Sequence, residues 1–258
     1  MIATEKKVFA RTPVLFPQIT HYCPGCGHGI VHRLVAEALE HYGVQQRAVC
    51  VAPVGCSVLA YKYIAVDAVE AAHGRAPAVA TGLKRARPDL FVFTYQGDGD
   101  LAAIGTAEII HAANRGENIS VVFVNNAVYG MTGGQMAPTT LLGQKTTTTP
   151  QGRSEVNEGP PVKVCELLAS MDAPSYVARV TVNKPAAVRK ARQAIITAFG
   201  RQVSGKGFSL VEVLSPCPTY WRLPPPKAME AVENWMMKTF PLGVFKNKEA
   251  ADAKIAQS

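Results

Sequence analysis

Short apolar runs alternate along the chain with stretches in which apolar residues recur at helical spacing. The runs at 48–52, 90–94, 119–124, 176–182 and 208–214 predict buried strands. Helical spacing predicts helices at 29–42, 101–114, 163–170 and 185–199, and a helix of small residues that ends near 84. Strands separated by helices pair in parallel through crossovers. The pattern therefore predicts an α/β fold, with a mostly parallel sheet and helices on both faces.

Two polar segments directly follow neighbouring predicted strands. Gly97-Asp98-Gly99-Asp100 ends one strand, and Asn125-Asn126 ends the next, so that Asn126 comes 28 residues after Asp98. Ligands of parallel sheets bind at the carboxyl ends of the strands, where we expect Asp98 and Asn126 to converge. Carboxylate and amide oxygens suit Mg²⁺ shared with a phosphorylated ligand, and the glycines let backbone N–H groups approach a phosphate. Gly-Asp-Gly alone is also a common turn, but the asparagine pair favours a magnesium diphosphate site.

Four of the six cysteines lie in tight turns or at strand ends. They are Cys23 and Cys26 in C-P-G-C, Cys56 in G-C-S, and Cys217 in S-P-C-P. Four gathered thiolates can hold a [4Fe–4S] cluster or a structural Zn²⁺, and their spacing does not choose between these metals. Buried cysteines without a metal are a third interpretation. Cys50, within a strand, and Cys165, within a helix, are expected only to pack.

Composition and charge narrow the function classes. The chain has 48% hydrophobic and 18% charged residues, and a net charge of +8. The charge either steers an acidic partner protein or reflects surface chemistry alone. Scattered basic residues without interleaved aromatics exclude nucleic-acid binding. Without a signal-peptide core or an apolar run of ~18 residues, we expect a cytoplasmic protein that does not bind membranes, in which metal binding or packing explains the cysteines better than disulfides do.

The motifs together resemble a known family. G-D-G followed by N-N is similar to the diphosphate-binding signature of thiamine diphosphate enzymes. The fuller segments GDGDLAAIGTAEIIHAANRGEN and NNAVYGMTGGQMAPTT resemble the β subunits of the 2-oxoacid:ferredoxin oxidoreductases, and the resemblance extends over about residues 20 to 225. It implies a thiamine diphosphate-binding fold. It also implies that Asp98, the Asn126 side chain and the Val128 carbonyl bind Mg²⁺.

The resemblance implies roles for further residues around thiamine diphosphate. Within HGRAPAVATGLK, His73 and Arg75 are expected to be catalytic and to face the diphosphate or the substrate carboxylate, although a lone histidine is more often an ordinary one. The segments CPGCGH, VGCS and SPC imply that the four turn cysteines hold a [4Fe–4S] cluster. The expected cofactor-binding residues are Gly55, Cys56, Ser57, His73, Gly97, Asp98, Gly99, Asp100, Asn126, Val128, Tyr129, Gly130, Met131 and Thr132.

A thiamine site beside an iron–sulfur cluster implies oxidative decarboxylation of a 2-oxoacid to acyl-CoA and CO₂, with electrons passed to ferredoxin. The segments MAPTT and KTTTTP resemble β subunits that act on 2-oxoglutarate or branched-chain 2-oxoacids more than those of pyruvate enzymes. We favour 2-oxoglutarate, with branched-chain 2-oxoacids or pyruvate as alternatives. No segment is recognisable as the source of the carboxylate that activates thiamine. The resemblance implies that an α subunit supplies this glutamate and much of the substrate pocket, with γ and ferredoxin-like subunits as further partners. A non-redox thiamine lyase would leave the cysteines unexplained, and a non-catalytic scaffold would leave G-D-G-D and N-N unexplained.

Two stretches depart from the alternation of strands and helices. Residues 130–153 are rich in Thr, Gly and Pro without periodicity, and a loop of this length is usually functional or disordered. We favour a function, because the loop leaves directly from the expected metal ligands. From about 224 a C-terminal extension is predicted: a stiff connector at Pro224–Pro226, an amphipathic helix at 228–238, and a polar tail that is peripheral or wrapped on a partner. Nothing marks a second domain, so 1–258 is predicted to be one domain.

Overall fold

The computed structural model describes residues 10–248, and a seven-stranded sheet runs through them in the order β2-β1-β3-β4-β6-β5-β7. All neighbouring strands pair in parallel except β7, which pairs antiparallel with β5. The strands are β1 (Ala48–Pro53), β2 (Asp67–Ala71), β3 (Phe91–Gly97), β4 (Ser120–Asn125), β5 (Tyr176–Thr181), β6 (Ser209–Leu214) and β7 (Gly243–Asn247). The prediction of a mostly parallel α/β fold is confirmed.

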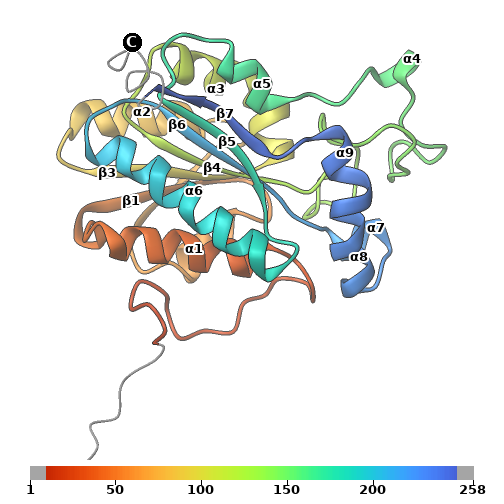
Figure 1. The fold of residues 1–258 in the computed structure, drawn as a ribbon, viewed down its shortest axis with the longest axis horizontal. Helices are drawn as coiled ribbons and strands as arrows, with labels where there is room; N and C mark the ends of the chain where they lie inside the picture. Colours follow the sequence, from red (N-terminus) through yellow and green to blue (C-terminus); the bar gives the residue numbers. More distant parts are fainter. Residues whose placement is uncertain (1–9, 249–258) are drawn as a thin grey trace, which may run out of the picture.

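Helices cover both faces of the sheet (Figure 1). The helices α1 (His28–His41) and α6 (Pro185–Val203) pack on one face, and α2 (Ala76–Ala86), α3 (Thr106–Asn114) and α5 (Val164–Ala169) pack on the other. The central strands β1, β3, β4 and β6 are therefore buried along almost their whole length, which explains why their sequences are continuous apolar runs. Cys50 and Cys165 lie in these two cores, as expected.

Three differences from the predicted elements have local causes. The helix predicted at 101–114 is divided at Gly105 into a π-helical turn, Asp100–Ile104, and α3. The connector predicted at Pro224–Pro226 is wrong, because α8 (Pro225–Ala231) begins there, and the fixed φ of proline suits a first helical turn. The edge strands β2 and β7 were not predicted, since both are largely exposed and lack an apolar run.

The segment 130–153 contains no helix or strand, as predicted, but it is extensively hydrogen-bonded. The buried Arg153 guanidinium donates to the carbonyls of Pro138, Thr140 and Pro160 at 2.7, 2.7 and 3.0 Å. One buried cation thus ties the middle of the loop to the segment that follows it.

Short elements complete the description. They are α4 (Glu155–Glu158), α7 (Pro218–Trp221), a π-helical segment Val232–Met236, α9 (Met237–Thr239), and 3₁₀ turns at Gln45–Arg47 and Val58–Lys62. Within residues 10–248, no helix has both the length and the apolarity to cross a bilayer. The first part of the predicted polar tail forms β7 at the edge of the sheet, and its residues from 249 onward lie outside the described residues. The single domain over 1–258 stays a prediction.

A buried ionic network joins the far half of the sheet to the end of β4. The fully buried Arg179 on β5 donates to Glu212 on β6 at 2.7 Å and to Glu166 on α5 at 2.6 and 3.0 Å. The other oxygen of Glu212 accepts a hydrogen bond from the Asn125 amide at 2.7 Å. Every charge in the network has a partner, so the loss of one member leaves another uncompensated inside the core.

Replacing Arg179 therefore tests how strongly this network stabilises the fold. We expect Arg179→Ala to lower the free energy of unfolding by about 3–5 kcal/mol, because Glu212 is left buried without its counter-ion. Urea denaturation followed by circular dichroism measures the change. The control is Arg189→Ala on the exposed face of α6, which should change stability by less than about 0.5 kcal/mol. Equal effects of the two substitutions would contradict the role given to Arg179.

Candidate functional site

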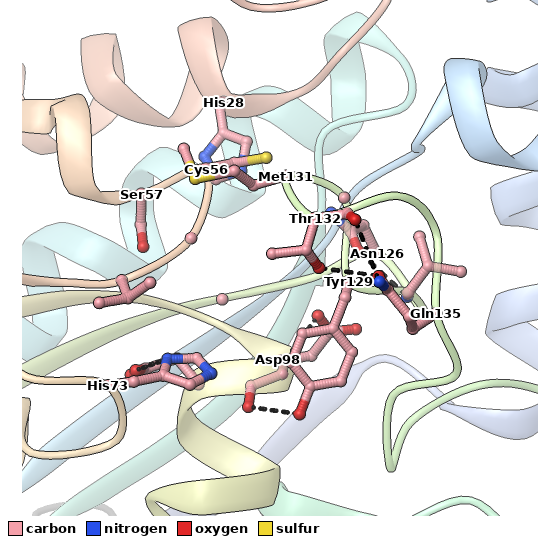
Figure 2. Close-up of a pocket in the computed structure, with 17 residues that line it drawn as sticks. His28, Cys56, Ser57, His73, Asp98, Asn126, Tyr129, Met131, Thr132 and Gln135 are labelled. Atoms are coloured by element: carbon pink, nitrogen blue, oxygen red, sulfur yellow. Dashed lines mark hydrogen bonds and ion pairs between the residues drawn. The ribbon is translucent and has the colours of Figure 1, made fainter. Parts of the chain in front are cut away.

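A cavity of about 400 Å³ opens at the carboxyl ends of the parallel strands (Figure 2). Its walls are the segment 54–57 after β1, His73 after β2, the segment 97–100 at the end of β3, and residues after β4 from Asn126 to Gln135. The chain leaves β1 for the edge strand β2 and returns to β3 on the other side of β1, so the cavity lies where the strand order reverses.

Every residue predicted to bind the cofactor lines this one cavity. Three further lining residues were not predicted: His28, Val54 and Gln135. Val54 directly precedes the expected Gly55, and Gln135 lies in the aperiodic loop, so only their neighbours in the sequence pointed to them. In Figure 2, Cys56 and His28 lie at one end of the cavity, with Asp98, Tyr129 and His73 at the other.

Asp98 is a buried carboxylate held by two donors. Its Oδ1 accepts from the Gly99 N–H at 2.9 Å, and its Oδ2 accepts from the Thr139 hydroxyl at 2.6 Å. Burial raises the pKa of Asp98 to about 6, although both donors act to lower it. A cation beside this carboxylate would favour its ionised form. Thr139 was missed from the sequence, because nothing local distinguishes it from the other threonines of the loop.

The turn after β4 presents two more oxygen donors. Ala127 has a left-handed φ of 60°, stabilised by a hydrogen bond from its N–H to the Asn125 side chain at 3.1 Å and by one from the Thr140 hydroxyl to its carbonyl at 2.6 Å. The Asn126 Oδ1 accepts from the Val128 N–H at 3.2 Å, and no hydrogen bond to the Val128 carbonyl is found within residues 10–248. A carboxylate, an amide oxygen and a backbone carbonyl around one cavity suit Mg²⁺ by their chemistry.

Tyr129 closes the floor of the cavity. Its hydroxyl donates to the Gly99 carbonyl at 3.0 Å. A Cβ on Gly99 would lie 2.3 Å from the Tyr129 ring, so glycine is required at this position for packing as well as for access to the backbone N–H groups.

His73 and Asp100 form a second polar pair at the cavity wall. The Asp100 carboxylate accepts from the Gly74 N–H at 2.5 Å and from the Gln96 amide at 2.7 Å. His73 Nδ1 lies 2.9 Å from Asp100 Oδ1, but off the direction of a hydrogen bond, so the contact is electrostatic. Asp100 was expected beside the diphosphate. It lines the cavity but is also committed to holding the segment that carries His73.

The structure does not bring Arg75 into the cavity. Its guanidinium pairs with Glu108 and donates to the Ile104 carbonyl at 3.2 Å, at the half-exposed start of α2. Its position two residues after His73 suggested a shared direction, but the turn at Gly74 separates the two side chains. A direct contact between Arg75 and a ligand in this cavity is therefore not supported by the geometry.

The four turn cysteines come from distant segments that meet beside the cavity. A Cβ on Gly130 would lie 3.3 Å from Cys56 Sγ, 3.6 Å from Cys217 Sγ and 3.6 Å from the Asn126 amide nitrogen. The turn that carries Cys23 and Cys26 is joined to the segment before Cys217 by a hydrogen bond from the Gly27 N–H to the Ser215 hydroxyl, 3.2 Å long. The sulfurs of Cys56 and Cys217 thus approach the oxygen-donor turn itself.

These thiols are neighbours but do not form a closed cage. Among residues 10–248, no three His, Cys, Asp or Glu side chains are already close enough together to hold a metal ion. Burial, with the neighbouring thiols adding to it, raises the pKa of Cys56 and Cys217 to about 12 and that of Cys26 to about 11. A metal cation would lower the pKa of these thiols, because it binds the thiolate form. The four sulfur donors suit a thiophilic metal centre, because thiolates are its preferred ligands and these thiols lie near one another.

An uncharged aromatic layer lies behind Cys56. The Tyr22 hydroxyl donates to the Cys56 carbonyl at 3.0 Å, and the His28 imidazole lies 2.7 Å from the Tyr95 hydroxyl. Burial lowers the pKa of His28 to about 3 and that of His32 well below its usual value. Both imidazoles are therefore neutral at pH 7, and this side of the site contributes no positive charge.

Comparison with known proteins agrees with the resemblance to thiamine diphosphate enzymes that the sequence motifs show. The chain matches the model of the family "Thiamine pyrophosphate enzyme, C-terminal TPP binding domain" over residues 53–213. Ketoisovalerate oxidoreductase subunit VorA of Methanothermobacter thermautotrophicus is 51% identical over 97% of this chain. The 2-oxoglutarate synthase subunit KorB of Archaeoglobus fulgidus is 41% identical over 80% of this chain and 73% of its own length.

A solved structure also has this fold. It is a 2-oxoglutarate:ferredoxin oxidoreductase from Magnetococcus marinus with 2-oxoglutarate, coenzyme A and succinyl-CoA bound, and it matches 93% of this chain and 86% of its own, with a TM-score of 0.76 and 28% identity. The chain spans about half the length of the VorA relatives, 53% in each case. The chain belongs to the thiamine pyrophosphate enzyme, C-terminal TPP-binding domain family, and within it to the β-type subunits of the 2-oxoacid:ferredoxin oxidoreductases.

Proposed function

We propose that this chain is the subunit of a 2-oxoacid:ferredoxin oxidoreductase that binds the diphosphate of thiamine diphosphate. The proposed reaction converts a 2-oxoacid and coenzyme A into acyl-CoA and CO₂, with the electron pair passed one electron at a time through a [4Fe–4S] cluster to ferredoxin. One observation carries the proposal. The sulfurs of Cys56 and Cys217 and the amide of Asn126 surround the same backbone position, Gly130, so that redox and diphosphate chemistry share one wall.

In this proposal, each group of side chains has its own task. Asp98, the Asn126 side chain and the Val128 carbonyl hold Mg²⁺ on the diphosphate, and Thr139 keeps the Asp98 carboxylate in place. Cys23, Cys26, Cys56 and Cys217 hold the cluster. The thiazolium of thiamine diphosphate supplies the electron sink for loss of CO₂. His73 lies at the end of the cavity that bears Asp98, where it would face the diphosphate or the substrate carboxylate, and its Nδ1 lies 2.9 Å from Asp100.

The proposal requires an α subunit. Thiamine activation needs a carboxylate on the aminopyrimidine ring, and among the described lining residues only Asp98 and Asp100 carry one. Asp98 is engaged by Thr139 and Gly99, and Asp100 by Gln96 and Gly74. The activating glutamate therefore comes from the partner. Further γ and ferredoxin-like subunits, and a cytoplasmic location, belong to the same proposal.

Two observations favour a branched-chain 2-oxoacid as substrate. The described residues that line the cavity include no lysine or arginine to bind a second carboxylate, and the exposed Val54 and Met131 offer an apolar surface. Identity to the ketoisovalerate subunit is 51%, against 41% to the 2-oxoglutarate subunit of Archaeoglobus fulgidus. The segments MAPTT and KTTTTP had favoured 2-oxoglutarate, which remains the second candidate.

Turnover by the complex tests both the activity and the substrate. The chain is purified anaerobically with its α subunit and assayed with thiamine diphosphate, Mg²⁺, coenzyme A and a viologen dye against a panel of 2-oxoacids. We expect 2-oxoisovalerate to give a kcat/KM at least about tenfold above that for 2-oxoglutarate, because an unpaired carboxylate would have to enter an apolar site. The isolated chain should be inactive. Full turnover without the α subunit would contradict the divided site, and a preference for 2-oxoglutarate would reverse the substrate assignment.

The iron content of cysteine variants tests the cluster. We expect the wild-type complex to contain iron and acid-labile sulfide with a visible absorption band, and Cys56→Ser to lose both, because a hydroxyl is a poor ligand for iron. The control is Cys50→Ala, which removes a buried thiol of the core and should leave the iron content unchanged. Wild-type protein that contains zinc and no iron would exclude the redox proposal.

The hydrogen bond from Thr139 tests the magnesium site without removing a proposed ligand. We expect Thr139→Val to weaken binding of Mg²⁺ and thiamine diphosphate about 10–100-fold, because loss of the hydrogen bond from the Thr139 hydroxyl leaves the Asp98 carboxylate free to turn away. Isothermal titration calorimetry on the complex measures the affinity. Thr197→Val, on α6 far from the cavity, is the matched control. Unchanged affinity in Thr139→Val would show that Asp98 does not depend on this contact.

A further inference from the structure

A second cleft, of about 870 Å³, lies between the loop 141–150 and the C-terminal helical segment. Three aromatic side chains line it, Tyr220, Trp221 and Trp235, together with three cations, Lys145, Arg222 and Lys238. None of its described lining residues is acidic. The cleft is large enough for a ligand of nucleotide size, and its lining combines flat apolar surfaces with positive charge only.

The three cations of the cleft have no side-chain partner. No hydrogen bond or ion pair from the side chain of Lys145, Arg222 or Lys238 is found among residues 10–248, although Glu230 and Glu233 lie on the neighbouring C-terminal helical segments. Glu233 pairs with Lys184 at 2.9 Å, and Glu230 pairs with Lys227 at 2.9 Å, both outside the cleft. Three unpaired cations around one hollow favour a polyanionic ligand.

Arg222 also has an unusual backbone conformation. Its φ of 54° is left-handed, and among the described non-glycine residues only Ala127, in the cofactor cavity, shares a positive φ. Glycine or asparagine would relieve the strain at the end of α7, so the guanidinium is present at a conformational cost. Strained non-glycine residues cluster at functional sites, and this second observation is independent of the charge.

Apolar surface is exposed in the same place. Trp235 is 53% exposed and Leu142 is 48% exposed, both on the cleft. The Tyr220 ring packs directly on the backbone of the loop, where a Cβ on Gly134 would lie 2.4 Å from it. An exposed indole beside unpaired cations is the kind of surface on which bases stack and phosphates bind.

We propose that this cleft binds a nucleotide, with its base on the aromatic side chains and its phosphates on Lys145, Arg222 and Lys238. The ligand is either the phosphorylated adenosine end of coenzyme A or a free adenine nucleotide. Assignment to coenzyme A rests on the proposed function, whereas the nucleotide site itself does not. The Trp221 indole N–H donates to the Asn126 carbonyl at 3.0 Å, so the cleft and the cofactor cavity share a wall.

The chain reports on this cleft through its own fluorescence, because its only two tryptophans, Trp221 and Trp235, both line it. The full chain is titrated with coenzyme A, dephospho-coenzyme A, ADP, pantetheine and inorganic pyrophosphate, in saturating thiamine diphosphate and Mg²⁺ so that the first cavity is engaged. We expect a saturable change in tryptophan emission with every nucleotide and none with pantetheine. Tighter binding of coenzyme A than of ADP assigns the site to coenzyme A, and equal or tighter binding of ADP assigns it to a free nucleotide.

Substitutions locate the binding in the cleft. Lys238→Ala should raise the Kd about tenfold, as expected for loss of one charge-assisted phosphate contact. Lys190→Ala, an exposed lysine of α6, removes the same charge elsewhere and should leave the Kd unchanged. Arg222→Gly should weaken binding by a similar factor without lowering Tm, because glycine accepts the left-handed conformation. A role of Arg222 only in ending the helix would leave the Kd unchanged.

Three results would overturn the proposal: no saturable emission change with any nucleotide, equal effects of Lys190→Ala and Lys238→Ala, or pyrophosphate binding as tightly as ADP, which would indicate a site for anions alone. The titration needs no turnover. Nucleotide binding by a chain whose complex fails to oxidise 2-oxoacids would therefore count against the proposed function and leave the nucleotide site standing.

Discussion

The buried carboxylate of Glu212 is the constraint on which the rest of the site depends. One of its oxygens neutralises Arg179 inside the sheet, and the other fixes the Asn125 amide at the end of β4. The Asn125 side-chain oxygen Oδ1 then accepts from the Ala127 N–H and stabilises its left-handed turn. That turn sets the directions of the Asn126 side chain and the Val128 carbonyl. Three hydrogen bonds in sequence thus connect the buried ion pair to the turn that bears the oxygen donors of the cavity. The positions of these donors are therefore set by the sheet and not by a flexible loop.

The ionisation of the metal-binding side chains depends both on their burial in the chain and on the metals that they bind. Without cations, burial raises the pKa of Asp98 and of the thiols of Cys26, Cys56 and Cys217, and the neighbouring His28 and His32 stay neutral. The protein therefore supplies positioned thiols that are protonated at pH 7, whereas the Asp98 carboxyl, with a pKa of about 6, is largely ionised there. Metal binding to the thiolate forms releases protons, which couples binding of the metal to the stability of the fold.

Much of this arrangement could be predicted from the sequence, because its signals are local. The buried strands are continuous apolar runs, and Asp98 and Asn126 follow directly on two of them, so parallel pairing alone brings these residues together. What the sequence did not reveal depends on contacts between distant segments. Thr139 reaches Asp98 from a loop without periodicity. The prolines at 225 and 226 begin a helix, although their local composition is typical of an extended connector. Glu108, which pairs with Arg75 and turns it away from the cavity, lies on another helix. The edge strands β2 and β7 lack apolar runs because half of each is exposed.

The two cavities are not independent, because they share both the loop 126–153 and Trp221. The indole N–H holds the Asn126 carbonyl, and the loop that bears Lys145 also supplies Thr139 to Asp98 and Thr140 to Ala127. A ligand that tilts the indole or draws Lys145 inward acts on the same hydrogen bonds that orient the oxygen donors. If such a ligand changes the affinity of the diphosphate cavity by some factor, occupancy of that cavity changes the affinity for the ligand by the same factor. The guanidinium of Arg153 ties its end of the loop to the carbonyls of Pro138 and Thr140. The segment 130–153, which has no helix or strand, thus lines both cavities and also holds the Asp98 carboxylate and the Ala127 carbonyl in place.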